Sequence, residues 1–297
     1  EAGKTYKLQV EYFDNGGDCF AGLYWKAPSA GSQNVLARFG DAGKVAAECD
    51  VTVAVLGINK SIEREGQDRF SLELPVDQQE FIKELYKVNP NTVVVLVAGS
   101  SMAVNWMDEN VPAILNAWYP GEQGGNAVAE VLFGDYNPGG RLPLTYYNSL
   151  DEIPAFDNYS VKGRTYQYFE GQPLYEFGYG LSYTKFRYKS KGVNVEQDTV
   201  KVSFEVSNTG KYDGDEVTQV YVKYPETGTY MPLKQLHGFK RVHIKKGKTS
   251  KVTIGVPKKD LRYWDEQERK FVTPKGEYTF MVGASSEDIK FRETVGL

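Results

Sequence analysis

The pattern of hydrophobic and polar positions changes twice along the chain, and the first stretch has the alternation of β-strands. Tyr6–Tyr12 and Phe20–Trp25 alternate in this way, and the turn sequence Asp-Asn-Gly-Gly-Asp lies between them. The pattern predicts a β-hairpin. Because a lone hairpin is only marginally stable in water, we expect it to be the remnant of a larger β structure or to pack on the next domain.

The second stretch alternates strands with helices. Val51–Gly57 and Thr92–Ala98 are continuous apolar runs, which predicts strands buried on both faces, and Val111–Trp118 predicts a third. Pro75–Asn89 and Gln123–Phe133 show helical spacing. This order predicts an α/β domain with a mostly parallel sheet. Ligand sites in such sheets form beyond the carboxyl ends of the strands, so the loop after Val51–Gly57 is the first place to search.

The third stretch begins with an irregular segment and continues with an all-β pattern. Gly134–Ser190 is irregular and rich in Gly, Pro and Tyr, which predicts an extended arm around the α/β core. From about Gly192, short alternating segments separated by turn residues predict an immunoglobulin-like or fibronectin-type sandwich. The predicted domains are therefore residues 1–28 (hairpin remnant), 29–190 (α/β sandwich with its arm) and 191–297 (β-sandwich).

Composition and charge mainly exclude some kinds of partner and some classes of protein. The 297 residues carry a net charge of -4, which favours neither nucleic acid nor an anionic membrane as a partner. No apolar run approaches ~18 residues, so no membrane-spanning helix is expected. Cys19 and Cys49 are the two cysteines, which excludes a disulfide scaffold and leaves one bridge or two free thiols open.

Candidate chemistry lies in the loop after the first buried strand, Ile58–Arg69. Glu63 and Glu65 are followed there by Asp68 and Arg69. A carboxylic acid on such a loop can donate a proton to a leaving-group oxygen, and a neighbouring arginine can tune its pKa. A solvated charged loop with no chemical role is the alternative interpretation.

Other chemistries fit poorly. His237 and His243 lie in the β-sandwich segment without a nearby cysteine, which argues against a metal site. The α/β segment contains no histidine for a Ser-His-Asp triad, and Gly99-Ser100-Ser101 is not a nucleophile elbow. The glycines of Pro120–Val128 are not followed by Lys-Ser/Thr, so a phosphate-binding P-loop is rejected.

Five motifs resemble one family. The segments, in order, are SIEREGQDRFSLELP (61–75), AWYPGEQGG (117–125), LFGDYNPGGRLPLT (132–145), KGRTYQY (162–168) and LYEFGYGLSYTKF (174–186). Together they closely resemble the C-terminal part of glycoside hydrolase family 3, the β-glucosidase and β-xylosidase family. The resemblance covers essentially the whole chain.

The resemblance implies a domain order. Family members place a (β/α)8-type barrel first, then an α/β sandwich, then often a fibronectin-III-like domain. The opening hairpin resembles the closing strands of the protective-antigen-like β-domain that some members insert in the sandwich, which would place its first strands upstream. Arg141 and Arg164 also match recurrent motifs and are expected to pack the arm.

The resemblance also assigns catalytic roles. A barrel aspartate is the family's nucleophile, and this chain contains neither the barrel nor its Ser-Asp-Trp-type motif. The acid/base glutamate of the Glu-Gly-x-Asp-Arg motif matches Glu65, with Glu63 as the alternative. Asp68 and Arg69 are expected to support the loop by ion pairs or hydrogen bonds. No substrate-binding residue is assigned.

The implied function is that of a retaining exo-β-glycosidase acting on terminal β-linked glucose or xylose, with no metal or organic cofactor. Its expected partners are a glycoside or oligosaccharide substrate and a barrel domain, in the same protein or as a separate chain. Export from the cytoplasm is expected from the resemblance to this family. The alternative is a non-catalytic carbohydrate-binding or accessory module of the same fold. An unrelated α/β ligand-binding protein is the remaining interpretation.

Overall fold

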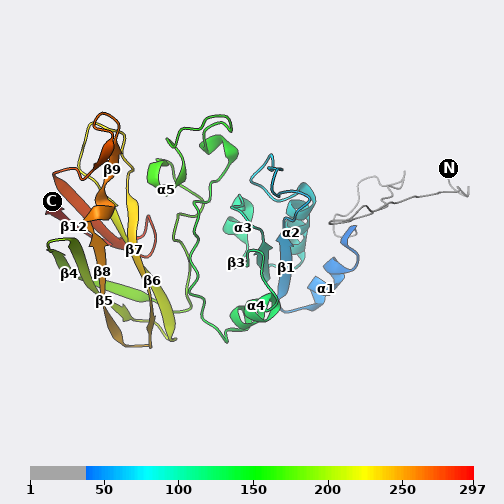
Figure 1. The fold of residues 1–297 in the computed structure, drawn as a ribbon. Helices are drawn as coiled ribbons and strands as arrows, with labels where there is room; N and C mark the ends of the chain where they lie inside the picture. The colour runs from blue at the N-terminus through cyan, green and yellow to red at the C-terminus, as the bar shows by residue number, and fades with distance from the viewer. Residues whose placement is uncertain (1–37) are drawn as a thin grey trace, which may run out of the picture.

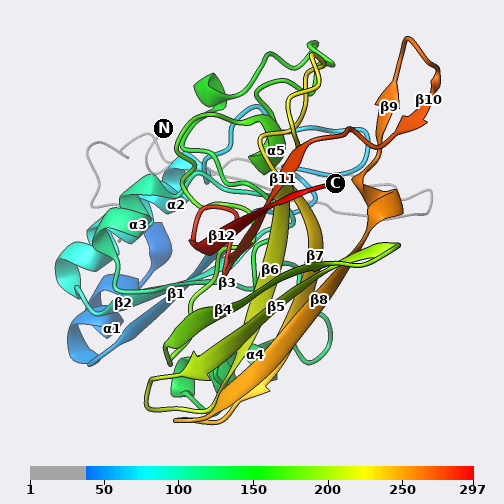
Figure 2. The same ribbon diagram turned by 90° about the vertical axis from the view of Figure 1, so that its left-hand side faces the viewer.

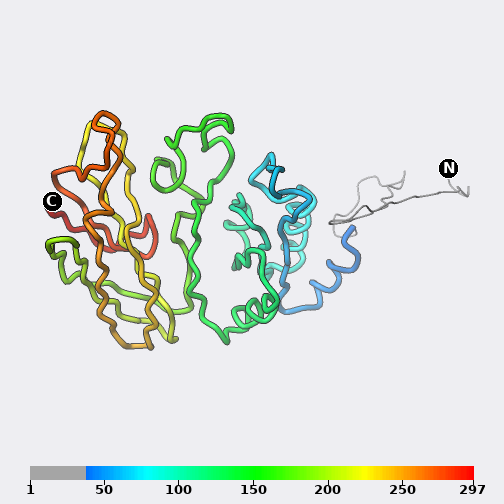
Figure 3. The backbone as a smooth tube through the Cα atoms, viewed as in Figure 1, coloured from blue at the N-terminus to red at the C-terminus, as the bar shows by residue number. Residues whose placement is uncertain are grey.

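A computed structural model describes residues 38–297, and the predicted hairpin and Cys19 lie outside this range. Figure 1 shows an α/β unit and a β-sandwich side by side, with an irregular arm running between them. The same path of the arm can be followed along the backbone tube in Figure 3. The predicted fold class, a mostly parallel α/β unit followed by a fibronectin-type sandwich, is confirmed for these residues.

The α/β unit is built on a three-stranded parallel sheet in the order β1-β2-β3. Its elements are α1 (Ala42–Glu48), β1 (Thr52–Gly57), α2 (Val76–Val88), β2 (Thr92–Val97), α3 (Asn105–Asn110), β3 (Ile114–Asn116) and α4 (Gly124–Phe133). The predicted strands and helices are present, with the third strand reduced to three residues. Helix α3 was not predicted, because six residues are too few to reveal a helical repeat.

One face of this sheet carries the core. Alternate residues of β1 and β2 pack with residues of α1, α2 and α3, and the buried set includes Ala46, Ala54, Leu56, Ile82, Leu85, Val94, Leu96 and Met107. The prediction that the first strand is buried on both faces is wrong. Val53 is 45% and Val55 65% exposed, because the described helices of this core pack on the opposite face of β1.

The arm from Gly134 to Lys185 contains little regular structure, as predicted. It holds a 3₁₀ turn at Leu150–Glu152 and the short helix α5 (Thr165–Tyr168). Gly134 ends α4 in the left-handed conformation, with φ of 82°, where glycine is the favoured residue. Two stretches of the arm pair with each other, since the Tyr146 amide donates to the Tyr175 carbonyl at 2.8 Å.

The β-sandwich packs a four-stranded sheet, β12-β11-β6-β7, against a three-stranded sheet, β4-β5-β8. Its elements are β4 (Phe186–Val195), β5 (Thr199–Asn208), β6 (Gly214–Lys223), β7 (Gln235–Ile244), β8 (Thr249–Pro257), a 3₁₀ turn at Lys258–Leu261, β9 (Tyr263–Asp265), β10 (Lys270–Val272), β11 (Glu277–Gly283) and β12 (Ile289–Gly296). Figure 2 shows the hairpin β9–β10 standing out from the sandwich. The predicted boundary between residues 190 and 191 falls inside β4.

Candidate active site

Three loops meet at the carboxyl end of the parallel sheet. The first follows β1 and carries the acidic residues, the second follows β2 at Gly99–Ser101, and the third follows β3 at Ala117–Tyr119. The second and third loops lie so close that a Cβ on Gly99 would stand 2.5 Å from the Tyr119 ring. The geometry matches the rule that sites in α/β sheets form at this edge.

The start of the acidic loop is fixed at Gly57. Its φ is +156°, and a Cβ there would lie 1.8 Å from the carbonyl oxygen of Val97, so only glycine fits. The Gln78 side chain on α2 accepts from the Gly57 amide and donates to the Gly57 carbonyl, both at 2.8 Å. Strand β1, helix α2 and the loop therefore share one anchor.

The interior of the loop is held by a partly buried ion pair. Arg69 Nε lies 2.9 Å from Glu63 Oε2, with side chains only 11% and 25% exposed. The same carboxylate oxygen accepts a 2.6 Å hydrogen bond from the Ser100 hydroxyl. Arg69 also donates to the Ser101 carbonyl. Burial lowers the pKa of the Arg69 guanidinium, and the Glu63 carboxylate opposes that change.

Glu65 occupies the tip of a tight turn. The flanking Arg64 and Gln67 exchange two backbone hydrogen bonds of 3.1 and 3.0 Å. Gly66 has a φ of +74°, as expected for the third position of a type II turn, and Glu65 precedes it. The Glu65 side chain is exposed, and it makes no hydrogen bond or ion pair within residues 38–297. The turn therefore presents a free carboxyl group to solvent.

The four candidate residues of the loop therefore fall into two pairs with different surroundings. Glu63 and Arg69 are brought together, whereas Glu65 and Asp68 are exposed and have no polar partner in the described part of the chain. Sequence reasoning did not assign Ser100 a role at this site. Its position directly after the second buried strand was the available signal, since parallel strands end at a common edge.

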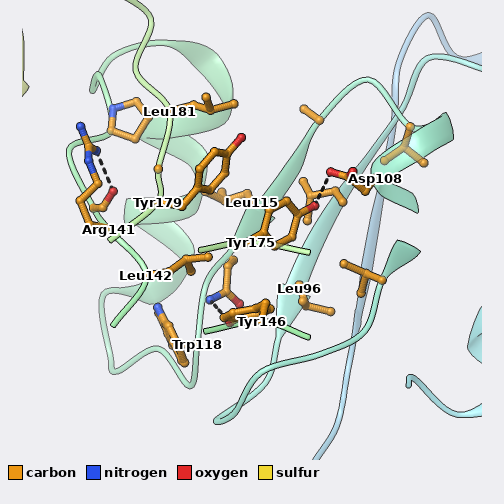
Figure 4. Close-up of a pocket in the computed structure, with 18 of the residues that line it drawn as sticks. Leu96, Asp108, Leu115, Trp118, Arg141, Leu142, Tyr146, Tyr175, Tyr179 and Leu181 are labelled. Atoms are coloured by element: carbon orange, nitrogen blue, oxygen red, sulfur yellow. Dashed lines mark hydrogen bonds between the residues drawn. The ribbon is translucent and has the colours of Figure 1, made fainter. Parts of the chain in front are cut away.

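A cavity of about 440 Å³ lies elsewhere, between β3 and the arm (Figure 4). Aromatic and aliphatic side chains line most of it, including Leu96, Leu115, Trp118, Leu142, Tyr146, Tyr175, Tyr179 and Leu181. Trp118 has a φ of 56°, a strained conformation for a bulky residue. Tyr175 donates to Asp108 at 2.6 Å, and the Asn116 amide donates to the Tyr146 hydroxyl at 3.2 Å.

The tyrosines of this cavity are protonated at neutral pH. Burial raises the pKa of Tyr146 to about 12, and burial together with the nearby Asp108 carboxylate raises that of Tyr175. The phenol groups of the cavity are therefore uncharged, and Asp108 and Arg141 are the charged residues that line it.

The described residues form no cluster of three or more His, Cys, Asp or Glu side chains that could hold a metal ion. His237 shares a hydrogen bond of 2.9 Å with Tyr224, and His243 lies 2.7 Å from Asp215. The same part of the chain has no helix with the length and apolarity needed to cross a membrane.

Comparison with known proteins places this fold and loop in a family. A model of the glycosyl hydrolase family 3 C-terminal domain matches residues 7–183, and a fibronectin type III-like model matches residues 216–286. A xylan 1,4-beta-xylosidase of Xylanibacter ruminicola is 43% identical over 225 residues, covering 75% of this chain and 26% of the relative. A periplasmic beta-glucosidase of Salmonella typhimurium is 33% identical, covering 91% of this chain and 37% of the relative.

Solved structures agree with these sequence matches. The crystal structure of a beta-glucosidase from Kluyveromyces marxianus in complex with glucose aligns with a TM-score of 0.81 and 36% identity. The alignment covers 86% of this chain and 33% of that enzyme, so the chain corresponds to about a third of its length. Because the family model matches more than half of the residues, the chain belongs to glycoside hydrolase family 3, as its C-terminal domain followed by a fibronectin type III-like domain.

Proposed function

We propose that this chain is the C-terminal part of a retaining exo-β-glycosidase and that Glu65 is its acid/base residue. The observation that carries the proposal is the contrast between the two candidate carboxylates. Glu63 is bound by Arg69 and Ser100 inside the loop, whereas Glu65 is exposed at the tip of the turn without a polar partner among the described residues. A general acid needs a carboxyl group that can reach substrate.

In the proposed mechanism a second carboxylate, an aspartate on a preceding barrel domain, attacks the anomeric carbon. Retaining enzymes hold their two carboxyl groups ~5–5.5 Å apart. Glu65 protonates the leaving oxygen as the glycosyl–enzyme bond forms, and the resulting carboxylate then removes a proton from the water that hydrolyses this bond. The Glu63–Arg69 pair keeps the loop in place, and the reaction takes place at the interface between the two domains.

The proposed substrates are terminal β-linked glucose or xylose, because the relatives include a beta-xylosidase and beta-glucosidases. Export is proposed because one relative is described as periplasmic. A non-catalytic carbohydrate-binding module is the second candidate, favoured by the fact that the chain spans only 26% and 37% of the length of these relatives.

The test compares Glu65→Gln with Glu63→Gln in the complete protein that contains the barrel. We expect Glu65→Gln to slow hydrolysis of a disaccharide by ~10²–10⁴-fold, because general-acid help is lost. Aryl glycosides with activated leaving groups should be slowed less in their first step. Azide, which needs no general base, should restore turnover of these substrates by Glu65→Gln.

Glu63→Gln is the matched control in the same loop. It removes the partner of Arg69, so we expect reduced activity on all substrates alike and no azide rescue. Azide rescue of Glu63→Gln instead of Glu65→Gln would assign the acid/base role to Glu63. Turnover by the isolated 297-residue chain, lost in Glu65→Gln, would show that the nucleophile lies within these residues and would overturn the division between domains.

A further inference from the structure

The hairpin β9–β10 stands out from the β-sandwich (Figure 2), and among the described strands β9 and β10 pair only with each other. Phe271 is the cross-strand partner of Trp264. Residues directly opposite in an antiparallel pair share a face, so both rings lie on one face of the hairpin. Trp264 is 49% and Phe271 60% exposed, and Trp264 is the one exposed tryptophan of residues 38–297.

The two rings and a nearby arginine form a corner. The ring centroids of Trp264 and Phe271 lie 5.3 Å apart, and the ring planes meet at 73°. The Arg262 guanidinium lies over the Phe271 ring, 5.8 Å from its centroid. Arg262 Nε donates to the Lys259 carbonyl, whereas its two terminal nitrogens have no hydrogen-bond or ion-pair partner within the described residues. We call Arg262, Trp264 and Phe271 the hairpin corner.

Contacts at both ends of the hairpin hold this corner in one orientation. At the turn, Asp265 Oδ1 accepts from the backbone amides of Gln267 and Glu268, both at 2.9 Å. At the base, Leu261 is fully buried in the core of the sandwich. An isolated hairpin is only marginally stable in water, so these contacts matter. A surface fixed in advance loses little conformational freedom when a ligand binds.

Stabilisation of the hairpin does not account for the hairpin corner completely. A cross-strand aromatic pair does stabilise a hairpin. After pairing, however, about half of each side chain still faces solvent. Tryptophan and arginine are also the residue types most enriched where binding energy is concentrated. The exposed rings and the unpaired guanidinium nitrogens together indicate a binding surface.

We propose that the hairpin corner binds a chain of β-linked glucose or xylose units outside the catalytic pocket. The class of sugar rests on the proposed function. In these two pyranoses the hydroxyl groups are equatorial, so the faces of each sugar ring are lined by C–H groups. Such a face stacks on the flat apolar face of an aromatic ring. The hydroxyls at the edge of the sugar accept hydrogen bonds from the terminal nitrogens of Arg262.

A sugar chain fits the hairpin corner better than a protein partner does. A specific protein interface buries about 800 Å² on each partner and involves roughly 20–30 residues a side, far more than the hairpin corner offers. With the ring planes at 73°, one ring can lie under a pyranose while the other borders its edge. Figure 1 shows the hairpin at the same end of the molecule as the loop after β1, which carries Glu65.

The test is native electrophoresis of the 297-residue chain through gels that contain soluble xylan or hydroxyethyl cellulose. We expect one or both polysaccharides to retard the chain, and the retarding polysaccharide identifies the sugar. Trp264→Ala and Phe271→Ala should each weaken the association constant at least about 10-fold, as expected for residues at the centre of a binding surface. Phe239→Ala is the matched control, because Phe239 is 68% exposed on β7, and it should change nothing. No retardation by either polysaccharide, or equal retardation of Trp264→Ala, would overturn the proposal.

A conservative variant separates sugar stacking from hairpin stability. Trp264→Leu keeps an apolar contact with Phe271 but has no flat ring. We expect it to change the Tm by at most about 2 °C, because substitutions of exposed residues have small effects. It should nevertheless lose retardation as fully as Trp264→Ala, whereas Trp264→Tyr should keep most of it. Full retardation of Trp264→Leu would contradict stacking on the ring.

Two further measurements separate this proposal from other occupants and from the proposed function. Self-association in sedimentation velocity that Trp264→Ala abolishes, without retardation by either polysaccharide, would assign the hairpin corner to a second copy of the chain and overturn the proposal. In the complete protein, Trp264→Ala should slow release of sugar from the retarding polysaccharide and leave turnover of an aryl glycoside unchanged. The gel measurement needs neither Glu65 nor turnover, so a failure of the proposed acid/base role remains distinguishable.

Discussion

The α/β unit and the β-sandwich differ in how completely they bury their own apolar surface. In the sandwich, two sheets enclose one core, and side chains such as Val202, Val206 and Phe280 are fully or almost fully buried. In the α/β unit, one face of β1 is exposed at Val53 and Val55, and the outer edge of β3 lies against a cavity. The sandwich therefore has the core of a self-sufficient domain, whereas the α/β unit offers surfaces to a neighbour.

Apart from the hairpin corner, the features with a candidate function lie in the α/β unit and not in the sandwich. The candidate acid/base loop, the strained Trp118 and an edge of β3 that pairs with no strand of residues 38–297 all belong to the α/β unit. Loops on a rigid scaffold commonly carry chemistry, and unsatisfied surfaces mark interaction sites.

The largest expected effect on stability comes from the buried ion pair that joins the regions. Arg141 on the arm lies 3.1 Å from Glu216 on β6, and their side chains are 8% and 4% exposed. Burial raises the pKa of Glu216, and Arg141 opposes that change. Arg141→Ala leaves this carboxylate buried and unpaired, so we expect a loss of about 3–5 kcal/mol in the free energy of unfolding.

Chemical denaturation of the purified chain measures this loss. The control is the double variant Arg141→Met/Glu216→Gln, which removes both charges and keeps the hydrogen bond from Tyr188 available. We expect the double variant to be clearly more stable than Arg141→Ala. Equal stability of the two would show that the unpaired charge is not what destabilises the protein.

Two valines, one in each region, test the difference in burial between the sandwich and the α/β unit directly. Val202 in the sandwich is 0% exposed, whereas Val55 in the α/β unit is 65% exposed. Val202→Ala should destabilise the sandwich by about 2 kcal/mol, and Val55→Ala should cost less than about 0.5 kcal/mol in this chain. Differential scanning calorimetry of both variants checks this, and comparable losses would mean that the exposed face of β1 is covered in solution.

The smallest expected effect is a change in the stability of the sandwich with pH. Burial lowers the pKa of His237, so the folded state favours the neutral ring that shares a hydrogen bond with Tyr224. A lowered folded-state pKa stabilises above the unfolded value of 6.5, and this contribution is lost as the pH falls through the folded value. The Tm of the wild-type chain should therefore fall between pH 6.5 and 5 more than that of His237→Gln.

His243→Gln is the control for this measurement, because His243 lies on the same strand and is 59% exposed. Parallel pH profiles for the wild-type chain and His237→Gln would remove His237 from the acid sensitivity of the sandwich.

Much of the fold could be predicted from patterns within short segments of the sequence. Apolar runs located β1 and β2 to within one residue at each end, and helical spacing located α2 and α4, because these patterns record burial along a single element. The candidate carboxylates could also be named from the sequence, because they directly follow the apolar run of β1. The exposed face of β1 could not be predicted, because an apolar run does not reveal whether a partner is present to cover it.

The sequence by itself determined the order of domains, the family and the identity of the acidic loop. Only the tertiary structure decided which carboxylate is held and which is free, because Ser100 lies 37 residues from its partner Glu63. It also decided that Arg141 meets Glu216, 75 residues away, and that β3 pairs with β2 alone among the described strands. Such contacts depend on how strands and arms pack in space, which the spacing of residues along the chain does not record.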